Sequence, residues 1–245
     1  LVSYYSFPSF ENTYPVVELA SLFSTDNLYS ILGQTNASFL VNGGWAGSLV
    51  ELNKTSGYWI KLNEADDITY TEYPNLEELT YNLNSGSNLI SFPSDGYYSL
   101  EDVLPAELEG VVYAILSEGM AAYYIDGGWV GALIGLEGFK GYWFKSYEPI
   151  EFSFDIPEGL ARKSSSQETE VLAGYEYNIS TLRSFYFVGD IPSASVNDWI
   201  IAMYNGQVVG TRQWKGEMVD IPVMGNDGEN YSKGYPQDGD IPEFK

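Results

Sequence analysis

The chain repeats itself: residues 28–61 read LYSILGQTNASFLVNGGWAGSLVELNKTSGYWIK, and residues 112–145 read VYAILSEGMAAYYIDGGWVGALIGLEGFKGYWFK. The two stretches align without a gap at an offset of 84 residues, and 14 of their 34 positions are identical. Both copies keep the patterns Gly-Gly-Trp-x-Gly-x-Leu and Gly-Tyr-Trp-x-Lys. Such self-similarity indicates a duplicated structural unit, and it decides how the chain is divided into domains.

Each copy predicts the same order of elements. Runs of β-branched and aromatic residues indicate short strands. The pairs Asn42-Gly43 and Asp126-Gly127 each predict a tight turn, because both residue types tolerate a positive φ. For the first copy we expect a helix within 13–23 and strands at 28–32, 37–42, 57–61 and 67–73; for the second, a helix within 97–108 and strands at 111–116, 121–126, 141–145 and 150–155.

The similarity continues upstream of the two stretches. Residues 6–9 and 91–94 both read Ser-Phe-Pro-Ser, at an offset of 85. Proline has no N–H for a strand ladder, so each of these segments is expected to end a short strand. In the second copy, Ser99 is followed three residues later by Asp102, which predicts a capping box at the start of the helix.

The C-terminal third of the chain has a different pattern. Residues 156–168 gather Ser, Glu, Arg and Lys and lose the hydrophobic pattern, as a linker does. Beyond them, Asn205-Gly206 joins two strand-like runs and predicts a hairpin with a two-residue turn. Further short runs separated by turn residues are typical of a β-sandwich. The strand-like runs are 171–180, 182–189, 198–214 and 218–225.

Together these patterns predict a mainly β chain. We expect two tandem small α+β repeat domains, each an antiparallel sheet with one short helix, followed by a β-sandwich-like domain. Because the chain has no Cys, the cores of such small domains must come from aromatic side chains. The predicted divisions are repeat domain 1 at 1–73, repeat domain 2 at 74–155, a linker at 156–168 and the β-sandwich-like domain at 169–245.

The composition excludes several kinds of chemistry. None of the 245 residues is Cys or His, so the chain has no disulfide, no Cys/His zinc site, no thiolate nucleophile and no imidazole base. Catalysis by two carboxylates, as in glycoside hydrolysis, stays open because the chain has 34 Asp and Glu residues. Nothing in the sequence singles out such a pair, so we expect a protein that is not an enzyme.

The charge restricts the partners of the protein. Eleven Lys and Arg residues against 34 Asp and Glu residues give a formal net charge of -23, which repels the phosphates of nucleic acids. No apolar run reaches the roughly 18 residues that a membrane-spanning helix needs, so we expect no membrane insertion. The sequence begins at Leu1 and not at Met, so we expect a processed product or a fragment.

Four aromatic residues of the repeat are the candidate ligand-binding residues: Trp45, Tyr58, Trp129 and Tyr142. Two interpretations apply to them. Small β-domains need large side chains in their cores, and the duplication of these residues fits that role. Alternatively, a flat ring that is exposed can stack against the apolar face of a sugar.

The C-terminal tail carries a group of oxygen-bearing side chains. Calcium binds six to eight oxygen ligands, and a loop of this kind can supply them. The spacing does not match an EF-hand loop, and Asn and Asp are also common turn formers. No other cofactor is expected. The candidate metal ligands are Asn226, Asp227, Glu229, Asp238 and Asp240.

The repeat motifs resemble those of known proteins. The combination of the Asn-Leu-Ile-Ser-Phe-Pro strand, the Ser-Leu-Glu-Asp-Val-Leu helix and the two tryptophan patterns is similar to tandem modules in structural proteins of marine bacteriophages, cyanophages especially, and in secreted bacterial surface proteins. The pattern of residues 198–245 resembles the β-domains that follow such modules. The resemblance implies a structural role in a virion or outside the cell, and it transfers no catalytic residues.

These observations lead to two expectations about function. The first is a non-enzymatic structural or adhesive protein of a virion or an extracellular surface, which assembles with other subunits or with copies of itself. The alternative is a carbohydrate-binding protein that uses exposed aromatic side chains, with a glycan as its partner.

Overall fold

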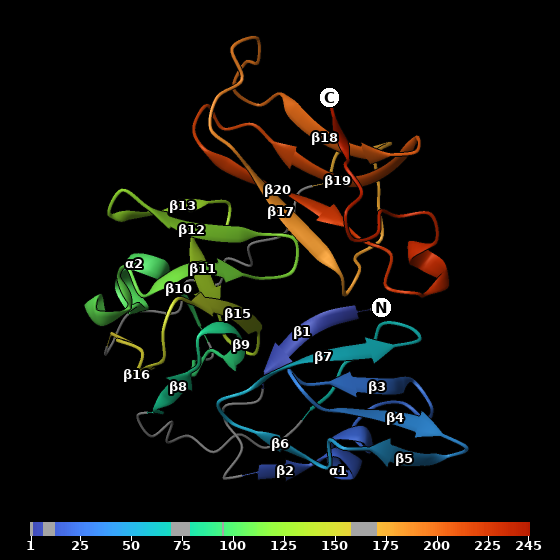
Figure 1. Ribbon diagram of the computed structural model, residues 1–245. Coiled ribbons are helices and arrows are strands. Elements are labelled where there is room, and N and C mark those ends of the chain that lie inside the picture. The colour runs from blue at the N-terminus through green and yellow to red at the C-terminus, as the bar shows by residue number, and fades with distance from the viewer. Residues whose placement is uncertain (1, 7–12, 70–78, 95, 158–170) are drawn as a thin grey trace. The chain divides into compact units, whose positions relative to one another are not determined.

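The computed structural model describes residues 2–6, 13–69, 79–94, 96–157 and 171–245 (Figure 1). The chain is mainly β, with several antiparallel sheets and short helices, as the sequence predicts. Most of the predicted linker at 156–168, and residues 70–73 of a predicted strand, lie outside the described residues. Within the described part, no helix is long and apolar enough to cross a membrane.

The contacts divide the chain into two compact units. Unit 1 comprises Leu1–Ser117 and Gly135–Ser166, and unit 2 comprises Glu118–Ile134 and Gln167–Lys245. Unit 1 therefore holds the first repeat and most of the second. Residues 118–134, which belong to the second repeat in sequence, group with the C-terminal region in unit 2.

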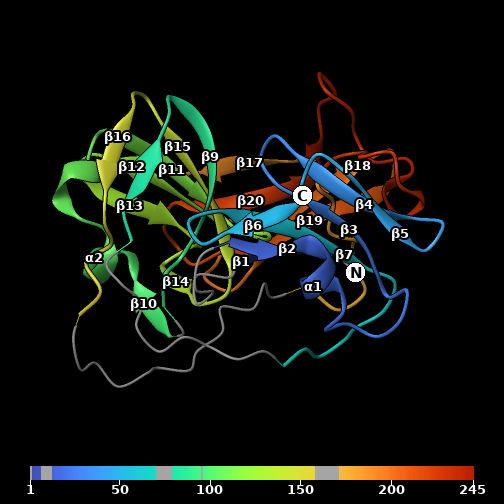
Figure 2. The ribbon, with the colours of Figure 1, turned by 90° about the horizontal axis from the view of Figure 1, so that it is seen from below.

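The first repeat forms a five-stranded sheet in the order β1-β7-β3-β4-β5, and β2 pairs with β6 beside it. The helix α1 and the β2–β6 pair cover one face of this sheet (Figure 1 and Figure 2). The elements are β1 (Val2–Ser6), β2 (Thr13–Pro15), α1 (Val16–Ala20), β3 (Leu28–Leu32), β4 (Ala37–Val41), β5 (Gly44–Gly47), β6 (Glu51–Asn53) and β7 (Gly57–Leu62).

The second repeat has equivalents of all eight of these elements, together with three further elements. Its elements are β8 (Tyr81–Leu83), β9 (Gly86–Ser91), β10 (Tyr97–Ser99), α2 (Leu100–Val103), the 3-10 helix η1 (Ala106–Leu108), β11 (Val112–Leu116), β12 (Ala121–Ile125), β13 (Gly128–Gly131), β14 (Gly135–Glu137), β15 (Gly141–Ser146) and β16 (Ile150–Phe152). Of these, β8, η1 and β16 have no counterpart among the described residues of the first repeat. The strand β16 pairs with β8.

The strand pairs of the two repeats also correspond. The pairs β9–β15, β11–β15, β12–β13 and β10–β14 are the equivalents of β1–β7, β3–β7, β4–β5 and β2–β6. Even the irregularities match: the register shifts between Leu28 and Ser30 in one copy and between Val112 and Ala114 in the other. These two places are 84 residues apart, which is the offset of the sequence alignment.

The predicted turns and the predicted N-cap at Ser99 are confirmed. Asn42 has a φ of 51° and Asp126 a φ of 53°, so both open their hairpins in the left-handed region. The hydroxyl of Ser99 accepts a hydrogen bond from the Asp102 N–H at 3.2 Å and donates one to the Asp102 carboxylate at 2.7 Å. In the first repeat the equivalent cap position is Pro15, whose side chain makes no capping bond.

The two repeats build their cores from different side chains. In the first, Val16 and Leu19 of α1 pack with buried residues that are aliphatic except for Tyr58, so the prediction of an aromatic core is wrong for this copy. In the second, five aromatic rings pack together at centroid distances of 5.1–6.1 Å, which confirms that aromatic residues supply this core. These rings belong to Tyr81, Phe92, Phe144, Phe152 and Phe154.

Side chains join the two repeats within unit 1. The amide of Gln34 donates to the Ser87 carbonyl at 2.7 Å and accepts from the Leu89 N–H at 2.9 Å, so it occupies backbone groups of β9 as a neighbouring strand would. The hydroxyl of Ser91 donates to the Lys54 carbonyl at 2.6 Å. These contacts connect residues 37–55 positions apart, and the sequence does not predict them.

Unit 2 has two small sheets around one apolar core. The strand β17 (Arg183–Val188) pairs with β20 (Val219–Met224), and β18 (Trp199–Tyr204) lies between β19 (Gln207–Gln213) and β21 (Glu243–Phe244). The core includes Ile200, Val209, Trp214, Ile221 and Tyr235. A 3-10 helix, η2 (Asn230–Ser232), lies between β20 and β21.

The strand predictions for this region hold with one correction. The hairpin at Asn205-Gly206 is confirmed, with φ values of 49° and 81°. The predicted strand at 171–180 is wrong, because no strand forms there. Gly174 takes a φ of 84° and the Tyr175 N–H bonds back to the Leu172 carbonyl at 2.9 Å, so the chain turns at this point.

Candidate functional site

The two candidate tyrosines lie inside their domains. Tyr58 and Tyr142 are each 3% exposed. Each hydroxyl accepts a hydrogen bond from a backbone N–H five residues earlier, from Asn53 at 2.6 Å and from Glu137 at 2.7 Å. Burial raises the pKa of both hydroxyls. Neither ring offers a face to a sugar, so the expected stacking role is not met by these two residues.

The two candidate tryptophans are half-buried and have different surroundings. Trp45 packs against the core of the first repeat and lines a cavity of about 280 Å³ together with Phe23 and Leu40. Trp129 lies edge-on to the ring of Tyr124, with centroids 5.3 Å apart and planes at 63°. The first repeat therefore has a hollow beside its tryptophan, while an aromatic neighbour contacts the tryptophan of the second.

Among the acidic residues of the tail, Asp227 connects three segments. Its Oδ2 accepts from the Thr181 N–H at 3.0 Å, the Thr181 hydroxyl at 2.9 Å and the Tyr231 hydroxyl at 2.6 Å. Its Oδ1 accepts from the Ser232 hydroxyl at 2.6 Å and the Glu229 N–H at 3.2 Å. Partial burial acts to raise the pKa of Asp227, but these bonds outweigh it and hold that pKa well below the usual value.

Two further candidate metal ligands, Asn226 and Asp240, serve turns of the tail, whereas Asp238 is exposed. The side-chain Oδ1 of Asn226 accepts a hydrogen bond from the Gly228 N–H at 2.9 Å. Asp240 Oδ2 accepts from the Gln237 N–H at 2.9 Å and from the Tyr204 hydroxyl at 2.7 Å, and these bonds lower the pKa of Asp240. Within the described ranges, no group of three or more Asp and Glu side chains is arranged to hold a metal ion. The calcium site stays a prediction.

The Asp227→Asn variant tests the role of Asp227 as a connector. Because the pKa of Asp227 is lowered in the folded chain, its contribution to stability is fully present above the ordinary value of 3.8 and is lost as the pH falls through the folded value. We expect the variant to lose about 1 kcal/mol at pH 7, a figure reduced for partial solvent exposure. Urea denaturation at pH 7 and pH 3 measures the difference.

The difference between the native chain and Asp227→Asn should be smaller at pH 3 than at pH 7, because the carboxylate of the unfolded chain already takes up protons there, but most of it should remain, because the folded carboxylate is still charged. Asp190→Asn is the control, because Asp190 is exposed in the same unit. A difference of the same size at both pH values would contradict the role of the charged carboxylate.

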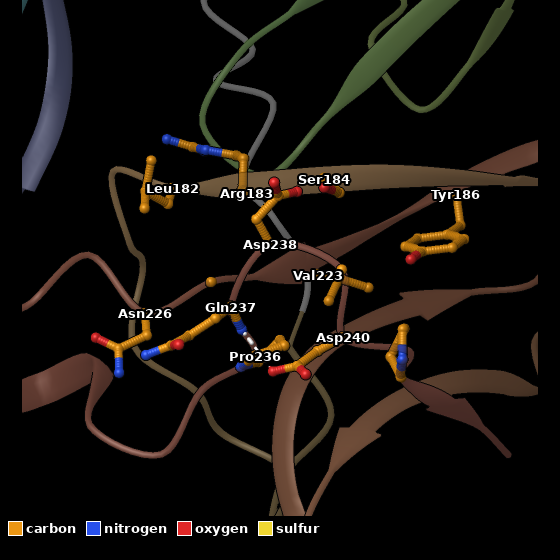
Figure 3. Close-up of a pocket in the computed structure, with 13 residues that line it drawn as sticks. Leu182, Arg183, Ser184, Tyr186, Val223, Asn226, Pro236, Gln237, Asp238 and Asp240 are labelled. Carbon is orange, nitrogen blue, oxygen red and sulfur yellow. Dashed lines mark hydrogen bonds between the residues drawn. The ribbon is translucent and has the colours of Figure 1, made fainter.

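A cleft of about 820 Å³ lies between β17 and the tail in unit 2 (Figure 3). Alternation along β17 exposes Ser184 and Tyr186 on the face that lines it. The opposite wall is formed mainly by residues 236–242. Its volume is within the range of about 300–1,000 Å³ that small-molecule sites occupy.

Hydrogen bonds fix the shape of the tail wall. The Asn226 N–H donates to the Pro236 carbonyl at 2.8 Å, and the Asp240 N–H donates to the Gln237 carbonyl at 3.0 Å. The Asp240 carboxylate is held in turn by Tyr204 of β18. This wall is therefore organised before any ligand arrives, which limits the entropy lost on binding.

A buried ion pair ties the β12–β13 hairpin to the C-terminal strands of unit 2. Nη2 of Arg212 in β19 lies 2.8 Å from Oδ2 of Asp220 in β20, and Asp220 is completely buried. Asp220 also accepts from the backbone N–H groups of Ala121 and Ala132, and Arg212 donates to the Gly119 carbonyl. Burial raises the pKa of Asp220, while the Arg212 guanidinium acts to lower it.

Neither this ion pair nor the cleft is predicted from the sequence. Arg212 and Asp220 lie in two separate predicted strand runs, and the backbone groups that they bind in the β12–β13 region lie 88–99 residues earlier in the chain. The cleft groups hydroxyl, amide and carboxylate side chains with one aromatic ring, an arrangement that can bind a ligand through hydrogen bonds and stacking. No protein-family model, no curated protein and no solved structure matches the chain.

Proposed function

We propose that this protein is a non-enzymatic structural or adhesive component of a virion or an extracellular surface. The observation that carries the proposal is the duplication of a complete β unit. The two copies share the position of a register shift and the hydrogen bond from a backbone N–H to a tyrosine hydroxyl. In both copies the polar groups of the repeat motif serve the fold: the hydroxyls of Tyr58 and Tyr142 bind the backbone at equivalent positions. Tandem units of this kind extend a protein and enlarge its surface, which suits a structural or adhesive role.

The charge and composition support the same proposal. A formal net charge of -23 keeps the chain away from nucleic acids and from anionic bilayers. The lack of His and Cys removes the side chains on which most nucleophilic and acid–base catalysis depends. The resemblance of the repeat motifs to structural proteins of marine bacteriophages and to bacterial surface proteins points in the same direction.

Immunogold electron microscopy tests this function. Antibodies raised against the purified chain are applied to intact virions and to unfixed cells from the source of the sequence. We expect gold particles on the outside of one of these two. Labelling that appears only after the cells are opened, and never on particles or cell surfaces, would contradict the proposal.

A second candidate function is carbohydrate binding at the hollow beside Trp45. The half-buried ring lines the 280 Å³ cavity, and sugars stack on rings that are accessible on one face. If this hollow binds sugars, Trp45→Phe should keep most of the binding on a glycan array, and Trp45→Ala should lose it.

Trp129→Ala provides the matched control at the equivalent position of the second repeat, where Tyr124 contacts the tryptophan. We expect glycan binding by this variant to equal that of the native chain. Equal binding by Trp45→Ala and the native chain would remove this second candidate. Thermal denaturation of each variant confirms that folding is retained.

A further inference from the structure

The cleft between β17 and the tail has the chemistry of a sugar site. Its lining includes the carboxylates of Asp238 and Asp240. Ser184 adds a hydroxyl and Gln237 adds an amide, as Figure 3 shows. Hydroxyl groups both donate and accept hydrogen bonds, so they match a lining that offers donors and acceptors side by side.

Several of these polar groups are available to a ligand. Within the described part of the chain, the side chains of Ser184, Gln237 and Asp238 make no hydrogen bond, and all three are exposed. Both bonds that Asp240 accepts end on its Oδ2, which leaves Oδ1 for a further donor. The backbone therefore positions Ser184, Gln237 and Asp238, and their side chains make no hydrogen bond to a described residue that a ligand would have to break.

An aromatic ring lies at one end of the same cleft. Tyr186 is 37% exposed, and its ring is held edge-on by Phe244 of β21, with centroids 5.1 Å apart and planes at 61°. A ring that is fixed on one side and open on another can carry the apolar face of a pyranose. Strand alternation places Tyr186 on the same face of β17 as Ser184, so the ring and the polar groups serve one ligand.

The charge of the lining disfavours an anionic ligand. Two carboxylates line the cleft, and the whole chain carries a net charge of -23, so an anionic ligand is repelled. A neutral molecule that is rich in hydroxyl groups is not repelled, and it can donate to the carboxylates and bond to the Ser184 hydroxyl and the Gln237 amide as well.

We propose that this cleft binds a neutral sugar unit of a surface glycan, with Tyr186 stacked on the ring and with Asp238 and Gln237 bonded to its hydroxyl groups. The proposal rests on the adhesive role given above and names the class of ligand for it. The site is separate from the hollow beside Trp45, which lies in unit 1.

Saturation-transfer NMR with the full chain tests the proposal. The neutral probes are glucose, galactose, mannose, N-acetylglucosamine and lactose, and the anionic probes are N-acetylneuraminic acid and glucose 6-phosphate. We expect at least one neutral probe to bind and both anionic probes to fail. Binding by the anionic probes alone, or by none of the seven at millimolar concentration, would overturn the proposal.

Variants locate the binding to the cleft. Tyr186→Ala should weaken the affinity for the bound neutral probe about threefold to tenfold, and Tyr186→Phe should retain most of it because the ring remains. Asp238→Ala should weaken it about tenfold or more, since a charged acceptor is removed from a side chain that supports no other contact. The matched control variants are Tyr175→Ala and Asp190→Ala, which change exposed residues outside the cleft.

The outcomes separate this proposal from the proposed function. If Tyr186→Ala and Asp238→Ala bind as tightly as the native chain, the cleft is not the sugar site, and loss of binding in Trp45→Ala would assign it to the hollow. A chain that labels a virion or cell surface but binds none of the neutral probes keeps the surface role and loses the cleft. A chain that binds through the cleft but labels no surface keeps the cleft and loses the surface role.

Discussion

The Asp220→Ala variant is expected to lose about 3–5 kcal/mol of unfolding free energy, because it leaves the guanidinium of Arg212 buried without its counter-charge. Asp220 is 0% exposed and Arg212 is 7% exposed, so water cannot replace the missing carboxylate without opening the structure. The N–H groups of Ala121 and Ala132 also lose their acceptor. Denaturation of the full chain with guanidinium chloride measures the loss of unfolding free energy. Asp190→Ala serves as the control, because Asp190 is exposed.

Hydrogen exchange locates the effect within unit 2. We expect the amide protons of Ala121 and Ala132 to lose protection in Asp220→Ala, because the carboxylate holds both of them. A loss below about 1 kcal/mol together with unchanged protection at these amides would show that the ion pair does not hold the hairpin.

The double variant Arg212→Met/Asp220→Leu separates the charge from the hydrogen bonds. Replacing both partners removes the unpaired buried charge, so the double variant should be more stable than Asp220→Ala alone. It should stay less stable than the native chain, because the hairpin N–H groups and the Gly119 carbonyl still lack partners. A double-variant cycle therefore gives the coupling energy of the pair.

The parts of the fold that the sequence predicts are those that local interactions determine. The turn at Asn205-Gly206 depends on the φ preferences of two adjacent residues, and the cap at Ser99 depends on a residue three positions away. The strands of the repeat follow from residue type and from the agreement of two copies. The same pattern in both copies predicts the longer strands β3, β4 and β7 and their equivalents β11, β12 and β15, whereas α1 and α2 are shorter than predicted and the short strands β5, β6, β13 and β14 are not predicted.

The parts that the sequence does not predict depend on distant residues. The contact of Gln34 with Leu89 and that of Asp220 with Ala121 join segments 55 and 99 positions apart. A single polar residue that binds a backbone group leaves no periodic pattern, because any Gln or Asp can occupy a surface position. The grouping of residues 118–134 with the C-terminal region follows from such contacts and not from the repeat.

The candidate site shows the same limit. Alternation along the Gly-Tyr-Trp strand separates its side chains into two faces, but it does not say which face is covered. Tyr58 and Tyr142 could therefore be read as core residues or as platforms, and their burial is decided by neighbouring strands. The cleft depends on the pairing of β17 with β20 and on the return of the tail, which only the structure shows.

Within the repeat motif itself, the last glycine of Gly-Gly-Trp-x-Gly is expected to tolerate no substitution. Gly47 and Gly131 have φ values of 152° and 132°, which side chains rarely allow. A Cβ at either position would overlap a carbonyl oxygen of the facing strand, that of Ala37 or that of Ala121. Each carbonyl accepts a hydrogen bond from a leucine N–H, at 3.0 Å in the first repeat and 3.1 Å in the second, so it cannot move away freely.

Gly47→Ala and Gly131→Ala should each lose about 3 kcal/mol or more, since backbone strain and overpacking each cost about 1–3 kcal/mol. The motif supplies its own control: a Cβ at Gly128 meets nothing within 4 Å and at Gly44 only the Val41 carbonyl at 3.9 Å, with no positive φ at either. Gly44→Ala and Gly128→Ala should therefore change stability by less than about 1 kcal/mol. Thermal denaturation of the four variants measures these losses, and equal losses at the second and last glycine of the motif would contradict the prediction. Because the same steric reason applies in both copies, the last glycine of the motif is explained by the close approach of two strands and needs no ligand.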